Sequence, residues 1–203
     1  MQGLIAKDTL LFFTLMNPFL MSIYLLDLIL NMESRAFGKV LMRGTLIATI
    51  TFVVIAWLGE SLFRDILQVR FESFQLFGGI VFLILGLRYV FQGAQALSSV
   101  RGDPEHLAGS IAMPFMIGPG TVSAAVIVGS HHRIDVAAGI LGSVMAVTLV
   151  TLYGLKLLHD YVKQRNARLI DRYVEIVGRI AALLSGTIAV EMILTGLDRY
   201  LKR

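Results

Sequence analysis

Six apolar runs of about 20 residues constrain this chain most, because a helix needs that length to cross the roughly 30 Å hydrocarbon core of a bilayer. The polar connections between them are too short to form a separate soluble domain. Only 16% of the 203 residues are charged, against roughly 25% in soluble domains. We therefore predict an all-α membrane protein with one transmembrane domain over residues 1–203. The predicted spans are Thr9–Leu30, Val40–Leu62, Gln75–Leu97, Leu107–Gly129, Asp135–Leu158 and Val174–Leu197.

Lys and Arg in the connections predict the orientation, because cytoplasmic loops normally carry the excess. Nine basic residues lie on the side of the first, third and fifth connections, and seven lie on the other side. We expect a multi-pass protein of the inner or plasma membrane with both termini outside. The nine are Arg35, Lys39, Arg43, Arg101, Lys156, Lys163, Arg165, Arg168 and Arg172, and the seven are Lys7, Arg64, Arg70, Arg133, Arg199, Lys202 and Arg203.

What the sequence lacks narrows the classes of function. It has no cysteine, which excludes disulfides, thiolate chemistry and cysteine-based metal sites. It has no zinc-protease, nucleophile-elbow or phosphate-loop motif. His131 and His132 stand in a short loop without a carboxylate cluster, so we expect them to be solvated. The formal charge of +4 comes from residues that flank spans. We expect no enzyme activity, cofactor, metal or nucleic-acid partner.

Two spans carry a proline where a continuous helix would not choose one. Asn17-Pro18 lies about eight residues into the first span, and Gly118-Pro119 interrupts the apolar run Ile111–Val128. Asn is a favoured N-cap and Pro a favoured first helical residue, so each pair predicts a half-helix that starts near the midplane. Free N–H groups and a positive dipole end there favour an anion or a carboxylate. The alternative is that both prolines only kink continuous helices.

The two sets of three spans resemble each other when the chain is shifted against itself. An odd number of spans per half puts the second copy in the membrane upside down, which is the inverted repeat of many secondary transporters. We expect repeats over residues 1–100 and 107–203, with chance similarity between apolar helices as the alternative. A shift of 100 matches Gly78, Ile80, Gly86 and Val90 with Gly178, Ile180, Gly186 and Val190; a shift of 101 matches Asn17-Pro18 with Gly118-Pro119 and Ser22 with Ser123.

Three of the ionisable residues inside spans are candidates for function, because a charge there is costly unless it is paired or hydrated. Arg88 lies about mid-span in the third run, and we expect a buried cation that holds a substrate carboxylate. Asp27, near the inner end of the first run, and Glu191, in the outer part of the sixth, are candidates for ion coupling. The alternative for the two acids is a structural ion pair or a side chain that reaches the headgroups.

Several of these stretches together resemble the MarC family of six-span membrane proteins, over nearly the whole chain. They are the Asn-Pro pair of the first span, the runs Phe77–Phe91 and Ile111–Val128, and the closing Met192–Leu197. The SnatA-like branch of that family implies uptake of glycine, alanine and similar amino acids, driven by an ion gradient. The resemblance also implies a basic residue at Arg88. The chain departs from the family pattern at Phe19–Ser22, where glycine and further prolines are usual.

These observations predict a secondary transporter of small neutral amino acids, coupled to H⁺ or Na⁺, that works by alternating access around a midplane site. Its partners would be the amino acid, the ion and membrane lipids, and a homo-oligomer is compatible with the sequence. An exporter or channel for another small solute and a non-transporting membrane assembly protein stay open as alternatives. We expect residues 17–22 and 118–123 to face each other near the midplane. The predicted substrate-binding residues are Asn17, Pro18, Ser22, Arg88, Gly118, Pro119, Gly120, Thr121 and Ser123.

Overall fold

The computed structural model describes residues 2–25, 28–29, 32–66, 68–92, 116–163 and 167–202. Within these residues the chain is helical and has no strand, as predicted. The helices are α1 (Gln2–Met16), α2 (Pro18–Tyr24), α4 (Ser34–Leu58), the π-helical turn η1 (Leu62–Ile66), α5 (Phe71–Gln92), α7 (Pro119–His131), α8 (Ile134–Lys163) and α9 (Ala167–Leu201).

Three segments of the described helices are long and apolar enough to cross a membrane, namely Ser34–Leu58, Phe71–Arg88 and Ile134–Val162. They overlap the second, third and fifth predicted spans. The predicted sixth span lies within α9, one continuous helix of 35 residues. The first half of the predicted fourth span lies outside the described residues, which resume at residue 116.

The first predicted span is broken at Asn17. Helix α1 ends just before this residue and α2 begins just after it. Asn17 has φ 38°, a left-handed conformation that Asn tolerates better than most residues. Pro18 then supplies the fixed φ and the missing N–H that suit a first helical residue. The break is therefore a local consequence of the Asn-Pro pair.

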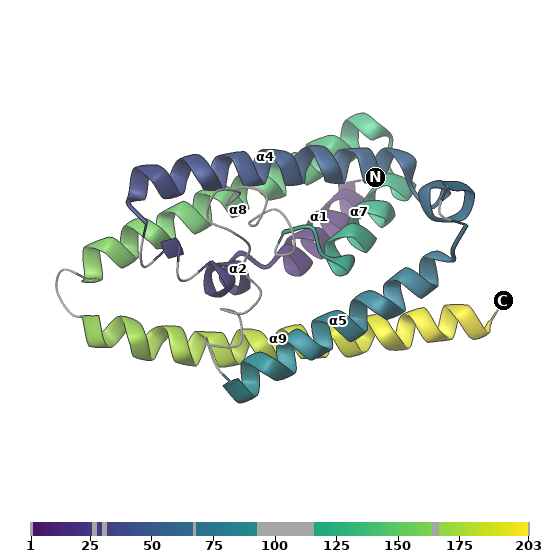
Figure 1. Ribbon diagram of the computed structural model, residues 1–203. Helices are drawn as coiled ribbons and strands as arrows, with labels where there is room; N and C mark the ends of the chain where they lie inside the picture. The colour runs from purple at the N-terminus through teal and green to yellow at the C-terminus, as the bar shows by residue number, and fades with distance from the viewer. Residues whose placement is uncertain are drawn as a thin grey trace.

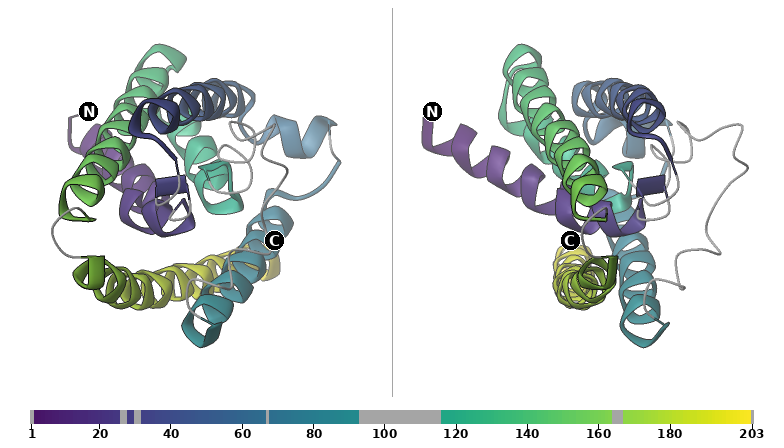
Figure 2. Two further views of the ribbon diagram at one scale, coloured as in Figure 1. Left: turned by 60° about the vertical axis from the view of Figure 1, so that its left-hand side comes forward. Right: turned by 90° about the vertical axis from the view of Figure 1, so that its left-hand side faces the viewer.

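The helices form three layers (Figure 1, Figure 2). Helices α4 and α8 make one outer layer, α5 and α9 make the other, and α1, α2 and α7 lie between them. Both outer pairs are antiparallel: Ser34 at the start of α4 bonds to Asp160 near the end of α8, and Gly196 near the end of α9 contacts Leu76 near the start of α5. In the middle layer, α2 contacts α8 and α9, whereas α7 contacts α4 and α5.

Small residues set the close approach of α5 and α9. A Cβ added to Gly86 would lie 3.3 Å from the Ala182 carbonyl oxygen and 3.4 Å from the Gly186 nitrogen. Membrane helices use such residues to bring their backbones together. A surface groove of about 430 Å³ lies at this crossing, lined by Ala182, Glu191 and four pairs of residues 100 positions apart: Leu83 and Leu183, Gly86 and Gly186, Leu87 and Thr187, and Val90 and Val190.

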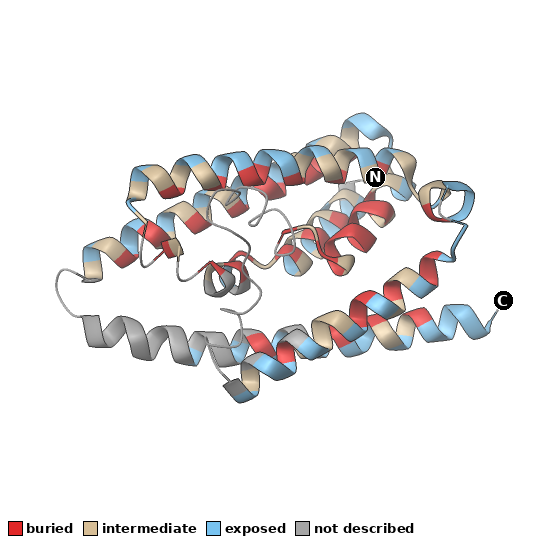
Figure 3. Cartoon of the chain, in the orientation of Figure 1, coloured by how far each residue is buried: buried red, intermediate tan, exposed pale blue. Residues whose placement is uncertain are grey.

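Helix α7 is enclosed by protein, whereas α4 buries only one face (Figure 3). Every residue from Gly120 to Val126 is buried, although the segment includes two hydroxyl side chains. An interrupted backbone inside a membrane protein is tolerated where protein or a water-filled cavity covers it. The start of α7 is therefore the described part of the molecule best suited to an internal site.

Candidate functional site

The start of α7 lies where α1, α5 and α9 meet. A Cβ added to Gly120 would lie 3.2 Å from Phe82 of α5, 3.3 Å from the Met192 sulfur of α9 and 3.7 Å from Leu15 of α1. Leu15 stands two residues before Asn17, so the two helix breaks are neighbours in the fold. Each break falls part-way along a predicted span, so the sequence predicts that both lie near the midplane of the membrane.

The half-helix predicted to start at Gly118-Pro119 is present in the structure. Pro119 is the first residue of α7, and Gly118 precedes it with an extended backbone. The Gly118 N–H donates to Thr121 Oγ1 at 3.0 Å, and the Thr121 hydroxyl donates to the Met116 carbonyl at 2.8 Å. The Thr121 hydroxyl therefore stabilises the helix start.

Three buried polar oxygens of the described residues have no hydrogen-bond partner: Ser123 Oγ on α7, Gln75 Oε1 on α5 and Thr45 Oγ1 on α4. Ser123 is 5% exposed. Gln75 precedes Gly78 by three residues and shares its face of α5, which packs against Pro119. Thr45 belongs to the buried face of α4, the helix that packs on α7. A buried oxygen without a partner costs about 1–3 kcal/mol, so water or a polar ligand is expected here.

The other predicted site residues are exposed, bonded within their own helix, or not described. Ser22 donates to a backbone carbonyl of α2, its own seven-residue helix, at 2.6 Å. The expectation of a buried cation at Arg88 is wrong, because this residue is exposed on α5. Glu191 is exposed on α9 and accepts a hydrogen bond from Thr195 at 3.3 Å. Asp27 lies outside the described residues.

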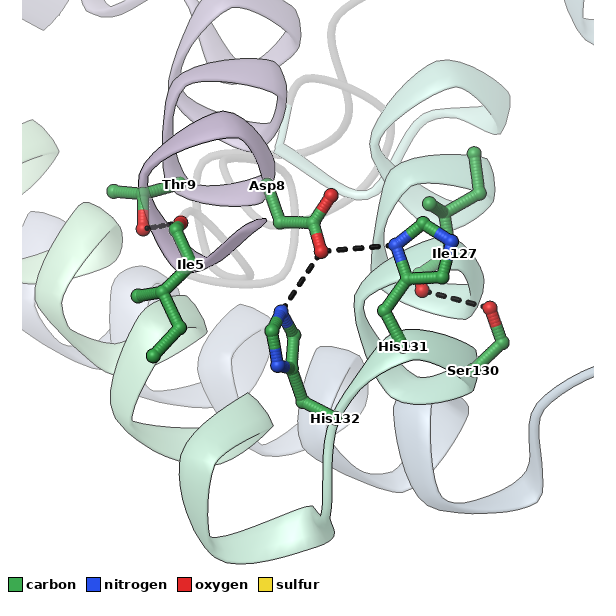
Figure 4. A network of polar contacts seen from close by, with 7 residues as sticks. All are labelled: Ile5, Asp8, Thr9, Ile127, Ser130, His131 and His132. Atoms are coloured by element: carbon green, nitrogen blue, oxygen red, sulfur yellow. Dashed lines mark hydrogen bonds and ion pairs between the residues drawn. The ribbon is translucent and has the colours of Figure 1, made fainter. Parts of the chain in front are cut away.

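A polar cluster that the sequence did not predict joins α1 to the end of α7 (Figure 4). Asp8 Oδ2 lies 2.9 Å from His131 Nδ1 and 2.8 Å from His132 Nε2. The side chains of Asp8 and His132 are 6% and 5% exposed. The expectation of solvated histidines is therefore wrong for His132, whereas His131 stays partly exposed. We call these three residues the Asp8 cluster. Among the described residues, no group of three acidic, His or Cys side chains is arranged to hold a metal ion.

A second buried cluster lies near the C-terminal end of α8. Lys156 Nζ donates to the Ile29 carbonyl and to Asp160, both at 2.7 Å, and the Ser34 hydroxyl donates to Asp160 as well. Lys156 is 2% exposed. Lys156, counted in the sequence among the charges that predict the orientation, is thus buried within the protein. The cluster ties α8 to the start of α4 and to the segment that precedes it.

Comparison with known proteins decides the family. Residues 3–201, nearly the whole chain, match the profile described as MarC family integral membrane protein. The chain belongs to the MarC family. The resemblance seen in the sequence is confirmed at this level, and the SnatA-like branch stays a prediction. Family membership and the three apolar helices together establish an integral membrane protein.

Three curated relatives of this MarC chain carry the name UPF0056 membrane protein. The UPF0056 membrane protein YhcE of Escherichia coli K12 is 24% identical over 198 residues, covering 91% of this chain and 87% of the relative. A UPF0056 membrane protein of Buchnera aphidicola is 20% identical over 199 residues, 97% of each chain. PH0214 of Pyrococcus horikoshii is 23% identical over 161 residues, covering 78% of this chain and 75% of the relative. No solved structure matches the chain.

Proposed function

We propose that this MarC family protein is a secondary transporter of small neutral amino acids, of the glycine and alanine class, in the cell membrane. Ser123 carries the proposal, because its hydroxyl is buried without a partner near the N-terminus of the half-helix α7. The free N–H groups and positive dipole end of that N-terminus favour a carboxylate. The amide oxygen of Gln75 and the Ser123 hydroxyl can accept from an ammonium group. A small zwitterion matches both kinds of partner.

Alternating access around this site, through two inverted repeats, is part of the proposal, and the helix contacts support it. The repeat would match α2 with α7, α4 with α8, and α5 with α9. Helix α2 contacts α8 and α9, and its counterpart α7 contacts α4 and α5, the counterparts of those two helices. The matched helices α4 and α8 run in opposite directions (Figure 1), as do α5 and α9. Gly86 faces Gly186, its own counterpart, as a residue on a two-fold axis does. Two such repeats can rock against each other around a site between them.

Counterflow of labelled glycine in proteoliposomes tests the proposal. Ser123→Ala is expected to raise the half-saturating glycine concentration roughly tenfold or more, because a hydrogen bond to a charged group contributes about 1.5–3 kcal/mol. The thermal unfolding midpoint should not fall, since the lost hydroxyl has no protein partner. Ser130→Ala, at an exposed position of the same helix, is the matched control. If folded protein gives no counterflow for any small amino acid, the proposal fails; flow of other solutes would favour an exporter or channel.

Coupling to H⁺ is part of the proposal, and the Asp8 cluster is the described group best placed for it. The cluster joins α1 and α7, the two helices whose broken ends meet at the site. Its carboxylate oxygen accepts from two rings, and a protonated carboxyl would give up at least part of that bonding. The neighbouring charges are exposed: Lys7 on α1, and the Arg133–Asp135 ion pair beyond α7. Gain and loss of one proton would therefore change how α1 holds α7.

Asp8→Asn separates proton coupling from transport. Counterflow needs no net gradient, so we expect it to persist in this variant. Glycine accumulation driven by an imposed pH gradient should be lost, because an amide does not take up the proton. Asp135→Asn, an exposed acid at the start of α8, should keep both activities. Accumulation by the Asp8 variant equal to that of the unmodified protein would place coupling elsewhere, with Asp27 the next residue to substitute.

A further inference from the structure

A groove of about 610 Å³ runs along the outer surface between α4 and α8. Its floor is apolar, and three basic side chains of α4 line it. Gly38 belongs to its wall, where a Cβ would lie 2.9 Å from the Tyr153 ring, so glycine lets this ring lie against α4. The basic residues are Arg35, Lys39 and Arg43, and the apolar ones are Met42, Leu149, Val150 and Tyr153.

Among the described residues, no acidic side chain pairs with the positive charges on this groove. Arg35, Lys39 and Arg43 are four residues apart, so they share one face of α4 and rise over about 12 Å. All three are exposed, and none forms an ion pair with a carboxylate of the described residues. Asp160, the acid near this end of α8, is already held by Lys156 and Ser34. An anion is therefore the ligand that this face would bind.

The position of the groove favours an anion that carries a hydrocarbon chain, as a membrane lipid does. Both helices that form it are long and apolar enough to span a bilayer. Helix α4, with 25 residues, is about 37 Å long, so its first turns reach the headgroup region beyond a hydrocarbon core of roughly 30 Å. The basic residues start there, and the apolar floor offers a surface for a hydrocarbon chain. Arg43 lies deepest, where an unpaired charge is most costly.

We propose that this groove is a binding site for an anionic phospholipid. The phosphate group lies among Arg35, Lys39 and Arg43, and one acyl chain lies along Met42, Leu149 and Val150. The charge distribution predicts that this end of α4 is cytoplasmic, where bilayers carry anionic lipid. The proposal is independent of the transported substrate, since no residue of the α7 site takes part.

Lipid binding to the purified, delipidated protein tests this site by native mass spectrometry. Phosphatidylglycerol should bind roughly tenfold or more tightly than phosphatidylcholine with the same chains. The variant Arg35→Gln/Lys39→Gln/Arg43→Gln should lose that preference. The control Lys7→Gln/Arg133→Gln/Lys202→Gln removes the same charge from exposed positions outside the groove and should keep it. An unchanged preference in the groove variant would overturn the proposal.

A second variant tests the acyl-chain half of the site without changing its charge. Val150 is exposed on the groove floor, so Val150→Trp should fold normally and fill the space. We expect it to weaken phosphatidylglycerol binding roughly fivefold or more, since it removes buried apolar contact. Glycerol 1-phosphate, the headgroup without chains, should not compete. Full competition by glycerol 1-phosphate, or unchanged lipid binding by the Trp variant, would show a plain anion site and refute the lipid groove. Coverage of the groove by a second copy of the chain, seen as a dimer insensitive to lipid, would refute it as well.

Discussion

Replacing Gly78 by alanine is expected to abolish glycine counterflow and to lower the free energy of unfolding by about 1–3 kcal/mol. Gly78 lies on α5 against the first residue of α7, and an added Cβ would overlap the Pro119 side chain and lie 3.3 Å from its Cα. The proline cannot turn aside, because its ring fixes φ and is part of the backbone. The half-helix must therefore shift, and Ser123 and the free N–H groups shift with it.

The matched controls are glycines with open space around them. Gly142 and Gly154 of α8 have no heavy atom within 4 Å of an added Cβ, so alanine there should leave counterflow unchanged. Thermal unfolding in detergent should show equal or greater stability, since alanine favours a helix more than glycine does. Normal counterflow and an unchanged unfolding midpoint in Gly78→Ala would mean that α5 and α7 do not pack this closely.

The features that the sequence predicted are those encoded by short stretches. A membrane span is a matter of length and apolarity, so α4, α5 and α8 were found from composition alone. The breaks at Asn17 and at Gly118-Pro119 were found because proline fixes its own backbone and suits a helix start. The family resemblance rested on the same local runs and is confirmed.

The features that the sequence did not predict depend on which helix faces meet. Asp8 and the two histidines are more than 120 residues apart, and no local pattern pairs them. Lys156 lies near the end of an apolar run, where a lysine usually faces the lipid headgroups. Its contacts with Asp160 and with the Ile29 carbonyl become visible only in the fold. The exposure of Arg88, by contrast, can be predicted from its spacing to Gly86. This residue is two residues from Gly86, hence about 200° around the helix, and points away once Gly86 faces α9.

Asp160→Ala is expected to lower the free energy of unfolding by about 3 kcal/mol, because it leaves the Lys156 ammonium buried with only a backbone carbonyl, that of Ile29, among the partners that the described residues give it. Asp160 also accepts from Ser34 and lies 3.2 Å from His159, so its loss removes bonds from three side chains at once. Unfolding by denaturant in detergent micelles, with helix content as the readout, measures the change. Asp198→Ala, which removes the exposed ion pair between α9 and Lys202 just beyond its end, should change stability little.

The double variant Lys156→Met/Asp160→Ala decides whether the loss comes from a buried charge. Methionine keeps an unbranched apolar side chain in the same space and carries no charge to bury. Replacing both members of a buried ion pair by apolar groups is often neutral or stabilising, so the double variant should recover most of the stability that Asp160→Ala loses. A double variant as unstable as the single one would mean that Asp160 acts through Ser34 and the start of α4. In either case the residue links the two long helices of one outer layer, so its loss should loosen the α4–α8 contact before the α5–α9 crossing.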